Sequence, residues 1–198
     1  PFVINAKEAE EVFAVLEQAN VFCMEALMYR YHPFTKKLQE LIQNKIIGDV
    51  KLFNATYTAN IAAIANPIAG GSIRNLGCYP VSLVRLLANA EPSEITALGR
   101  VDCDTCNDNQ ASAILKFANN SMAVISTADD IDMFWQFDIY GTDGCLKLMT
   151  NPWLPDCKNN KIIIQRKDEK ISQEINVTAE KSLYTYQIDT VSNKIRNV

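Results

Sequence analysis

Apolar residues recur every three or four positions near both ends of the chain, the period of a helix with one buried face. Near the N-terminus, Asn5 and Glu8 have the spacing of a capping box, which predicts a helix start. The apolar stripe of this helix is Ala9, Val12, Phe13, Leu16 and Ala19. A second stripe predicts a terminal helix and comprises Tyr184, Ile188, Val191 and Ile195.

Between these helices the pattern changes several times. The nearly continuous apolar run from Val21 to Tyr29 predicts a buried strand. Pro33 then predicts the start of a short helix with Leu38, Leu41 and Ile42 on its apolar face. Residues 50–58 are strand-like, and a further helix with Leu83, Leu86 and Leu87 on its buried side follows a Gly-Gly pair.

From residue 94 onward, apolar and polar residues alternate, which predicts strands with one buried face. Such segments cover residues 94–101, 111–117, 122–127, 135–139 and 146–149, and two more lie on either side of residues 167–170. Six to eight consecutive strands flanked by helices predict an α+β fold, with one large, open, mostly antiparallel sheet and helices on one face. The other face has mixed rather than strongly charged residues, which favours a protein partner.

Composition narrows the function classes. Of the 198 residues, 48% are hydrophobic and 21% are charged, which is typical of a folded globular chain and not of a disordered one. The formal net charge of −4 and the scattered lysines argue against a nucleic-acid partner. The chain has no apolar run long enough to span a membrane and no signal peptide, so we expect no membrane partner and a cytoplasmic protein.

A metal site is not expected. Cys103 and Cys106 have the CxxC spacing of a zinc site, but the sequence has no second CxxC pair and His32 is its one histidine. Because a structural zinc ion needs four ligands, these cysteines are interpreted as ordinary loop residues.

The Gly70–Leu87 segment is the strongest candidate for a small-molecule site. Gly70 and Gly71 permit close backbone approach, and a helical pattern begins directly after them. Asn75 and Tyr79 are four residues apart, so both are expected on one side of that helix near its start.

This segment resembles the Gly-Gly-x-x-x-Asp-x-Gly-x-His/Tyr segment of the glucose–fructose oxidoreductase, inositol dehydrogenase and rhizopine-catabolism (Gfo/Idh/MocA) family. Other stretches are similar to the same family, in the same order along the chain: Pro1–Ala9, Glu25–Pro33, Glu40–Ile42, Ile47–Val50 and Ile139–Leu146. Together they cover almost the whole length.

The resemblance implies a missing domain. Family members begin with a nucleotide-binding domain that has a Gly-x-Gly-x-x-Gly turn, which this sequence lacks, and Pro1 corresponds to the residue after the family's catalytic lysine. We therefore interpret residues 1–30 as the end of the nucleotide-binding domain, a helix plus a strand. Residues 31–198 are interpreted as the C-terminal substrate-binding and oligomerisation domain. The full-length protein is expected to use NAD or NADP, and this fragment to bind neither and to be inactive alone.

The resemblance also implies roles for Tyr79 and Asn75. Much of the family has histidine as the acid–base group and aspartate one turn earlier, whereas this chain has Tyr79 and Asn75 at those positions. A phenol with an ordinary pKa near 10 can serve if a cation lowers that pKa, and the family's lysine would be the cation. Asn75 can orient a substrate hydroxyl but cannot transfer a proton. Without the resemblance, the favoured interpretation of Tyr79 is an ordinary amphipathic helix residue with its hydroxyl in solvent.

Six other residues are candidates. Arg30 and His32 lie in the loop that, in the family, lies against the nicotinamide and the substrate, so both are predicted to bind substrate, and Arg30 and Pro1 to contact the cofactor. Gly70 and Gly71 are predicted to line the substrate site. Trp153 could stack on a sugar ring or simply pack in the core.

Two hypotheses follow for the function. The first is an NAD(P)-dependent oxidoreductase that transfers hydride between nicotinamide and a sugar, polyol or cyclic diol, as a homodimer or larger oligomer joined through the open sheet face. The second is a non-catalytic relative that binds a ligand or a protein partner, which the replacement of aspartate by Asn75 favours.

Overall fold

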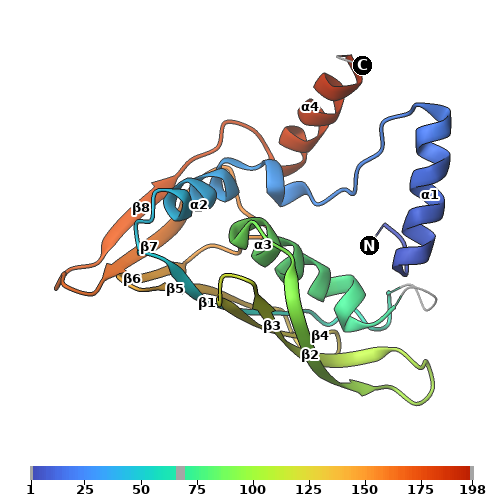
Figure 1. Cartoon of the computed structure of the whole chain (residues 1–198), viewed down its shortest axis with the longest axis horizontal. Helices are drawn as coiled ribbons and strands as arrows, with labels where there is room; N and C mark the ends of the chain where they lie inside the picture. Colours follow the sequence, from blue (N-terminus) through green and yellow to red (C-terminus); the bar gives the residue numbers. More distant parts are fainter. Residues whose placement is uncertain (1, 66–69, 197–198) are drawn as a thin grey trace.

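The computed structural model, which describes residues 2–65 and 70–196, contains one eight-stranded sheet with helices over one of its faces (Figure 1). The strand order is β2-β3-β4-β1-β5-β6-β7-β8. Within the described ranges, β1 and β4 form a parallel pair and the other neighbours are antiparallel. The strand bounds are β1 Val50–Thr58, β2 Pro92–Val101, β3 Asp108–Phe117, β4 Met122–Ala128, β5 Phe134–Gly141, β6 Gly144–Leu148, β7 Asn160–Arg166 and β8 Gln173–Val177. The predicted α+β fold is confirmed.

The parallel pair follows from the path of the chain. After β1 the chain crosses above the sheet in a helix and then forms the β2–β3 hairpin before β4 returns beside β1. Parallel neighbours require such a crossover, because a tight turn can join only antiparallel strands. The crossover helix therefore lies directly over the middle of the sheet.

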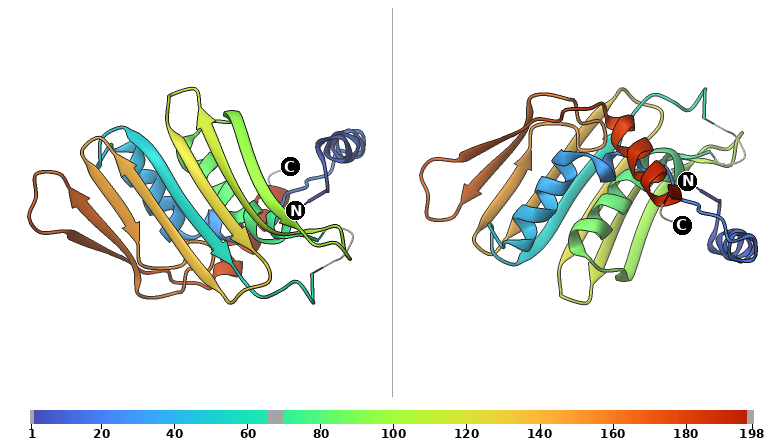
Figure 2. Two further views of the ribbon diagram at one scale, coloured as in Figure 1. Left: turned by 90° about the horizontal axis from the view of Figure 1, so that it is seen from below. Right: turned by 90° about the horizontal axis from the view of Figure 1, so that it is seen from above.

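The helices are α1 Ala6–Ala19, α2 Pro33–Gln43, α3 Cys78–Ala88 and α4 Leu183–Arg196, with short turns η1 Met28–Tyr31 and η2 Ile73–Gly77. Figure 2 shows α2 and α3 side by side over the sheet, with α1 standing apart from it. The predicted cap of α1 is confirmed, because the Asn5 side chain accepts a hydrogen bond from the backbone N–H of Glu8 at 3.0 Å. No residue of α1 is buried, although Phe13 of its apolar stripe stacks on Phe2 with a ring-centroid distance of 5.9 Å.

The strand predicted from Val21 to Tyr29 is wrong. Residues 21–27 have no regular secondary structure, and Met28–Tyr31 forms a 3-10 turn. Val21 and Phe22 are 54% and 39% exposed. A strand needs a neighbour for its backbone hydrogen bonds, and none of the eight strands pairs with this segment.

The segment before α3 also differs from a regular helix. Ile73–Gly77 forms a π-helical turn that continues directly into α3. A Cβ atom on Gly77 would lie 3.5 Å from Thr127 Cγ2, so the turn packs closely on β4. Such turns are rare and widen the helix locally, which changes the direction of the side chains that precede α3.

The core lies between the sheet and the pair α2 and α3. Its largest buried side chains on the sheet are Phe53 of β1, Phe117 of β3 and Phe137 of β5, which meet Leu38 of α2 and Leu83 of α3 in one cluster. Alternate residues of the same strands point to the opposite face, which no described helix covers (Figure 2).

The uncovered face has a mixed surface, as the sequence predicted. Leu98 and Ile114 are 83% and 46% exposed on β2 and β3. The same face also has polar residues on neighbouring strands. The hydroxyl groups of Ser112 and Ser126 are hydrogen-bonded at 3.0 Å, and the Gln136 side chain donates a hydrogen bond to the Asp138 carboxylate at 2.6 Å.

Candidate active site

The start of α3 faces the segment that leads into η1, and together they line a cleft of about 510 Å³. Asn75 and Tyr79 both line it, as the sequence predicted for two polar residues on one side of the helix start. The other lining residues are Phe2, Met24, Glu25, Ala26, Leu27, Arg74 and Cys78. The cleft thus combines a phenol, an amide, a carboxylate and a guanidinium with apolar walls.

Tyr79 is held from two sides. Its ring packs edge-on against Tyr57 of β1 with a centroid distance of 5.8 Å, and its carbonyl oxygen accepts a hydrogen bond from the Tyr29 hydroxyl at 3.3 Å. Burial, with smaller contributions from Cys78 and Tyr57, raises the pKa of Tyr79 to about 12. The phenol is therefore protonated at neutral pH in the described chain and can donate a hydrogen bond or a proton.

Asn75 is held by its own helix. Its side-chain Nδ2 donates to the carbonyl oxygen of Gly71 at 3.0 Å, and its backbone N–H donates to the same oxygen at 3.1 Å. An aspartate here could not make the first of these bonds, because a carboxylate has no donor. The amide therefore has a structural role in this chain, and its oxygen remains an acceptor for a substrate hydroxyl.

Gly70 and Gly71 are buried beside Asp108 and do not line the cleft. Gly71 has a φ of +102°, and a Cβ atom there would lie 2.2 Å from the Asp108 carboxylate. The glycine pair therefore makes room for this carboxylate, and the prediction that the pair contacts substrate is not met by this geometry.

Arg30 does not reach the Asn75–Tyr79 cleft. In the η1 turn Tyr29 points into the core and Arg30 is exposed. Arg30 lines a separate cleft with Ser82, Arg85 and Glu91, and Arg85 is paired with Glu91 at 2.6 Å. The predicted contact of Arg30 with the substrate and cofactor is therefore not supported by the described residues, and Pro1 lies outside them.

His32 is a helix cap and not a substrate-binding residue. It is fully buried, and its Nδ1 accepts a hydrogen bond from the backbone N–H of Phe34 at 3.2 Å. Its ring packs edge-on against Tyr186 with a centroid distance of 5.5 Å. Burial lowers the pKa of His32, and the proximity of Asp156 partly offsets this effect. The prediction that His32 binds substrate is wrong, because the ring is enclosed between α2 and α4.

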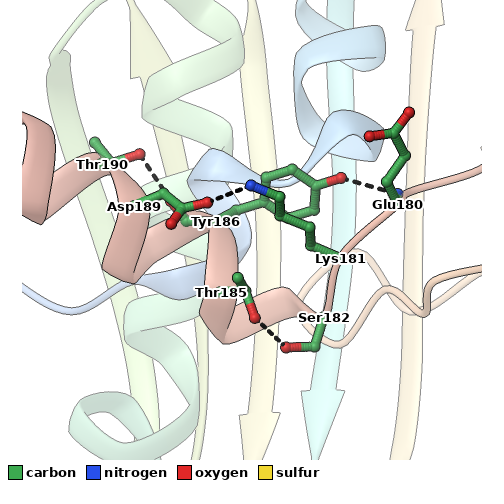
Figure 3. Close-up of polar contacts among 7 residues, drawn as sticks. All are labelled: Glu180, Lys181, Ser182, Thr185, Tyr186, Asp189 and Thr190. Atoms are coloured by element: carbon green, nitrogen blue, oxygen red, sulfur yellow. Dashed lines mark hydrogen bonds and ion pairs between the residues drawn. The ribbon is translucent and has the colours of Figure 1, made fainter.

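The start of α4 holds Tyr186 over His32. Figure 3 shows that the Tyr186 hydroxyl accepts a hydrogen bond from the backbone N–H of Glu180 at 3.0 Å, and that Lys181 pairs with Asp189 at 2.7 Å. The hydroxyl groups of Ser182 and Thr185 form a hydrogen bond of 2.8 Å at the first turn of α4 (Figure 3). These contacts keep α4 packed on η1 and enclose the histidine.

Trp153 is a core residue. It is fully buried in the β6–β7 connection, with its ring 4.5 Å from that of Tyr57 and 6.1 Å from that of Phe137. Neither face of the indole is free to stack on a sugar, so the packing interpretation is correct. Through Tyr57, Trp153 supports Tyr79 from behind.

The sequence interpretation missed Arg74, Glu25 and Cys78 as lining residues. Arg74 and Cys78 lie within the quoted glycine-rich segment, and Glu25 opens the Glu25–Pro33 segment that resembles the family. The Glu25 carboxylate accepts a hydrogen bond from the backbone N–H of Phe2 at 3.0 Å, which ties the N-terminal segment to the cleft.

The part of the chain that the structure describes has no cluster of three or more histidine, cysteine, aspartate or glutamate residues arranged for a metal ion. Across the described ranges, no helix combines the length and the apolar character that crossing a membrane requires.

Comparison with known proteins gives the family. The sequence profile described as "GFO/IDH/MocA C-terminal domain" matches residues 35–147, which is more than half of the chain. The chain belongs to the GFO/IDH/MocA family. This match covers β1 to β5, most of β6 and all of α3, and therefore includes Asn75 and Tyr79.

Two relatives with known activity are similar in sequence. The chain is 31% identical over 175 residues to trans-1,2-dihydrobenzene-1,2-diol dehydrogenase of Xenopus tropicalis, an alignment that covers 86% of this chain and 52% of that protein. It is 31% identical over 157 residues to D-xylose 1-dehydrogenase (NADP(+)) 2 of Haloferax volcanii, covering 77% and 47%. The chain thus spans about half the length of the curated relatives it matches.

The fold is also that of solved family enzymes. The structure of KijD10, a 3-ketoreductase from Actinomadura kijaniata in complex with TDP-benzene and NADP, aligns with a TM-score of 0.86, 20% identity, and coverage of 100% of this chain and 60% of that one. At this identity the likeness establishes the fold alone.

Proposed function

We propose that this chain is the substrate-binding part of an NAD(P)-dependent oxidoreductase that transfers hydride between nicotinamide and a cyclic diol or sugar. The observation that carries the proposal is Tyr79 at the cleft, at the position where family members have their acid–base group. The names of the relatives, a diol dehydrogenase and a xylose dehydrogenase, support this substrate class.

Tyr79 has the chemistry that the reaction requires. When bound, the nicotinamide supplies or accepts the hydride, and a protein group must deliver or remove a proton at the substrate oxygen. With a pKa of about 12, the Tyr79 phenol can donate to a carbonyl oxygen during reduction. The reverse reaction requires a nearby cation that lowers this pKa, a role that we assign to the family's lysine before Pro1. Asn75 orients the substrate with its amide oxygen.

The domain assignment is part of the proposal. Residues 1–30 would belong to the nucleotide-binding domain and residues 31–198 to the substrate domain. The residues that line the cleft fit the substrate end of the site, but the sequence has no Gly-x-Gly-x-x-Gly turn to hold the pyrophosphate. We therefore expect the 198-residue chain neither to bind NADP tightly nor to turn over substrate.

Asn75 favours a second candidate. An amide at the position of the family's aspartate cannot carry charge, and here it is bound to Gly71. A relative that binds a sugar or diol without a redox step would tolerate this replacement. Substrate binding without NADP reduction by the full-length protein would support this alternative.

The decisive experiment uses the full-length protein with NADP+ and either trans-1,2-dihydrobenzene-1,2-diol or D-xylose. Tyr79→Phe should lower kcat by roughly 10²–10⁴-fold while NADP affinity and stability change little, because only the hydroxyl is lost. Tyr140→Phe, on the uncovered face of the sheet, is the matched control and should keep wild-type turnover. Wild-type turnover in Tyr79→Phe would remove Tyr79 from the mechanism.

We further propose that the protein forms a homodimer or larger oligomer through the uncovered face of the sheet. Exposed Leu98 and Ile114 beside uncharged polar residues form a surface suited to a second copy about a two-fold axis. Light scattering should report a dimer or a larger species. Leu98→Asp should dissociate it, and a wild-type monomer at high concentration would contradict the proposal.

A further inference from the structure

The helical segment that carries the cleft residues begins without a cap of its own. The backbone N–H groups of a first helical turn need acceptors outside the helix. Neither Ser72, which precedes η2, nor Gly77, which precedes α3, caps its helix with a side chain. The acceptor comes instead from another element, the first residue of β3.

Asp108 supplies this acceptor. One of its carboxylate oxygens, Oδ2, accepts hydrogen bonds from the Ser72 hydroxyl at 2.7 Å and from the Ile73 backbone N–H at 2.8 Å. The Thr127 hydroxyl of β4 donates to the Ser72 carbonyl oxygen at 3.2 Å. Ser72 is fully buried between these two strands. The start of the segment is thus bound to the sheet at two points.

These contacts continue to the cleft. Gly71 adopts a φ of +102° and leaves the space that the Asp108 carboxylate occupies. The carbonyl oxygen of Gly71 then accepts both hydrogen bonds from Asn75, and Tyr79 follows one turn later. Asp108, Gly71 and Asn75 therefore form one continuous chain of contacts that ends at the cleft.

A carboxylate at this position also has an energetic cost. Burial raises the pKa of the neighbouring Asp129, and the charges of Asp108 and Asp130 raise it further. A neutral side chain at 108 would remove part of that repulsion. The two hydrogen bonds to Ser72 and Ile73 offset the cost, because bonds to an ionised acceptor are stronger than neutral ones.

We propose that Asp108 is a positioning residue for the site, which anchors η2 to the sheet so that Asn75 and Tyr79 stand in the cleft. That these two residues act on a substrate rests on the proposed function, whereas the anchoring does not. Asp108 itself lies outside the cleft and touches neither residue's side chain in the described contacts.

The anchoring is tested on the 198-residue chain by amide hydrogen exchange, which reports local opening. In Asp108→Ala, exchange of residues 72–77 should become at least tenfold faster, while the last turn of α3, residues 84–88, changes less than twofold. Asp104→Ala, in the exposed loop between β2 and β3, removes a similar charge and should leave both segments unchanged. Ser72→Ala, which removes one of the two bonds, should give a smaller increase.

The effect on Tyr79 is read from the NMR resonance of its labelled ζ-carbon, assigned with Tyr79→Phe. Asp108→Ala should shift or broaden this resonance, and Asp104→Ala should not. Unchanged exchange at 72–77, or an unchanged Tyr79 resonance, overturns the proposal. If Asp108→Ala does not fold, Asp108→Asn, which retains one acceptor oxygen, and Ser72→Ala decide the same question.

The full-length protein separates this proposal from the proposed function. With NADP+ and the diol or D-xylose, Asp108→Ala should lower kcat/KM at least tenfold without changing NADP affinity, and Asp108→Asn should be intermediate. Equal turnover in wild type and Asp108→Ala overturns the positioning role. Inactivity of the wild type with both substrates contradicts the proposed function, while exchange and NMR still decide whether Asp108 positions Tyr79.

Discussion

The helices α2 and α3 lie side by side on the same face of the sheet, but their first turns are held in different ways. The cap of α2 is local: His32 accepts from Phe34 two residues later, and Pro33 occupies the first turn between them. The cap of α3 and its π-helical start comes from Asp108, which lies 35 and 36 residues away from its two donors.

This difference matches the different roles of the two helix starts. A local cap determines where a helix begins but not where it lies relative to the sheet. A cap from a strand ties the helix start to that strand, which a site made of several elements requires. The polar residue at the start of α2 is therefore structural, and those at the start of α3 face a cleft.

The largest effect that tests this comparison is on the local cap. His32→Ala should lower the free energy of unfolding of the chain by roughly 2–4 kcal/mol, because a helix cap is lost and a cavity opens under Tyr186. Urea denaturation measures the change. His32→Asn keeps a capping oxygen and should cost less. If His32→Ala leaves stability unchanged but weakens substrate binding by the full-length protein, His32 is a substrate-binding residue and not a structural cap.

The second effect concerns the two glycines of the α3 segment. Gly71→Ala should destabilise the chain by about 1–3 kcal/mol, since a Cβ atom would meet the Asp108 carboxylate at a backbone conformation that disfavours side chains. Gly77→Ala is the matched variant. Its Cβ would find ordinary contacts, and alanine favours a helix, so a gain of up to about 1 kcal/mol is expected in thermal unfolding. Equal effects would contradict the special role of Gly71.

A smaller effect is expected from Asn75→Asp. The substitution removes the hydrogen bond to Gly71 and sets a carboxylate against a carbonyl oxygen, so stability should fall by about 1 kcal/mol. Chemical denaturation of the chain measures this loss. In the full-length protein, a rise in turnover would identify the natural asparagine as the mark of a weakened enzyme, and a fall would mean that the site is built around the amide.

The smallest effect is a pH dependence that comes from the buried cap. The pKa of His32 is lower in the folded chain than its ordinary value near 6.5, because burial disfavours the charged ring. Protonation therefore favours unfolding, and stability should fall as the pH drops below about 6.5. Unfolding of wild type and His32→Asn is compared between roughly pH 7.5 and 5. Parallel curves would show that His32 does not titrate as proposed.

The sequence predicted most of the fold correctly, for reasons that act over short distances. The strand Val50–Thr58 has its predicted bounds, and the alternation of Ala111, Leu115 and Phe117 places these residues on the buried face of β3. Alternation is reliable here because one face of this sheet is covered and the other is not. The sequence also predicted the cap of α1 by Asn5 and the start of α2 at Pro33.

The errors have a common physical origin. Val21–Tyr29 reads as a buried strand, but a strand exists only where another strand pairs with it, and that partner is not in the sheet. His32 and Trp153 are residue types that bind substrates in many proteins. Here the packing of α4 and of the β6–β7 connection encloses both of them.

The residues of the site also differ in whether short-range or long-range contacts position them. The four-residue spacing of Asn75 and Tyr79 predicted that they share a cleft, because local helix geometry brings them to one side. Nothing near Ser72 in the sequence indicates Asp108, whose hydrogen bonds to Ser72 and Ile73 exist only because β3 lies beside the helix start. Local periodicity and caps were encoded in short stretches of sequence. The position of the helix start over the sheet depended on contacts between residues more than 30 positions apart, which no short pattern contains.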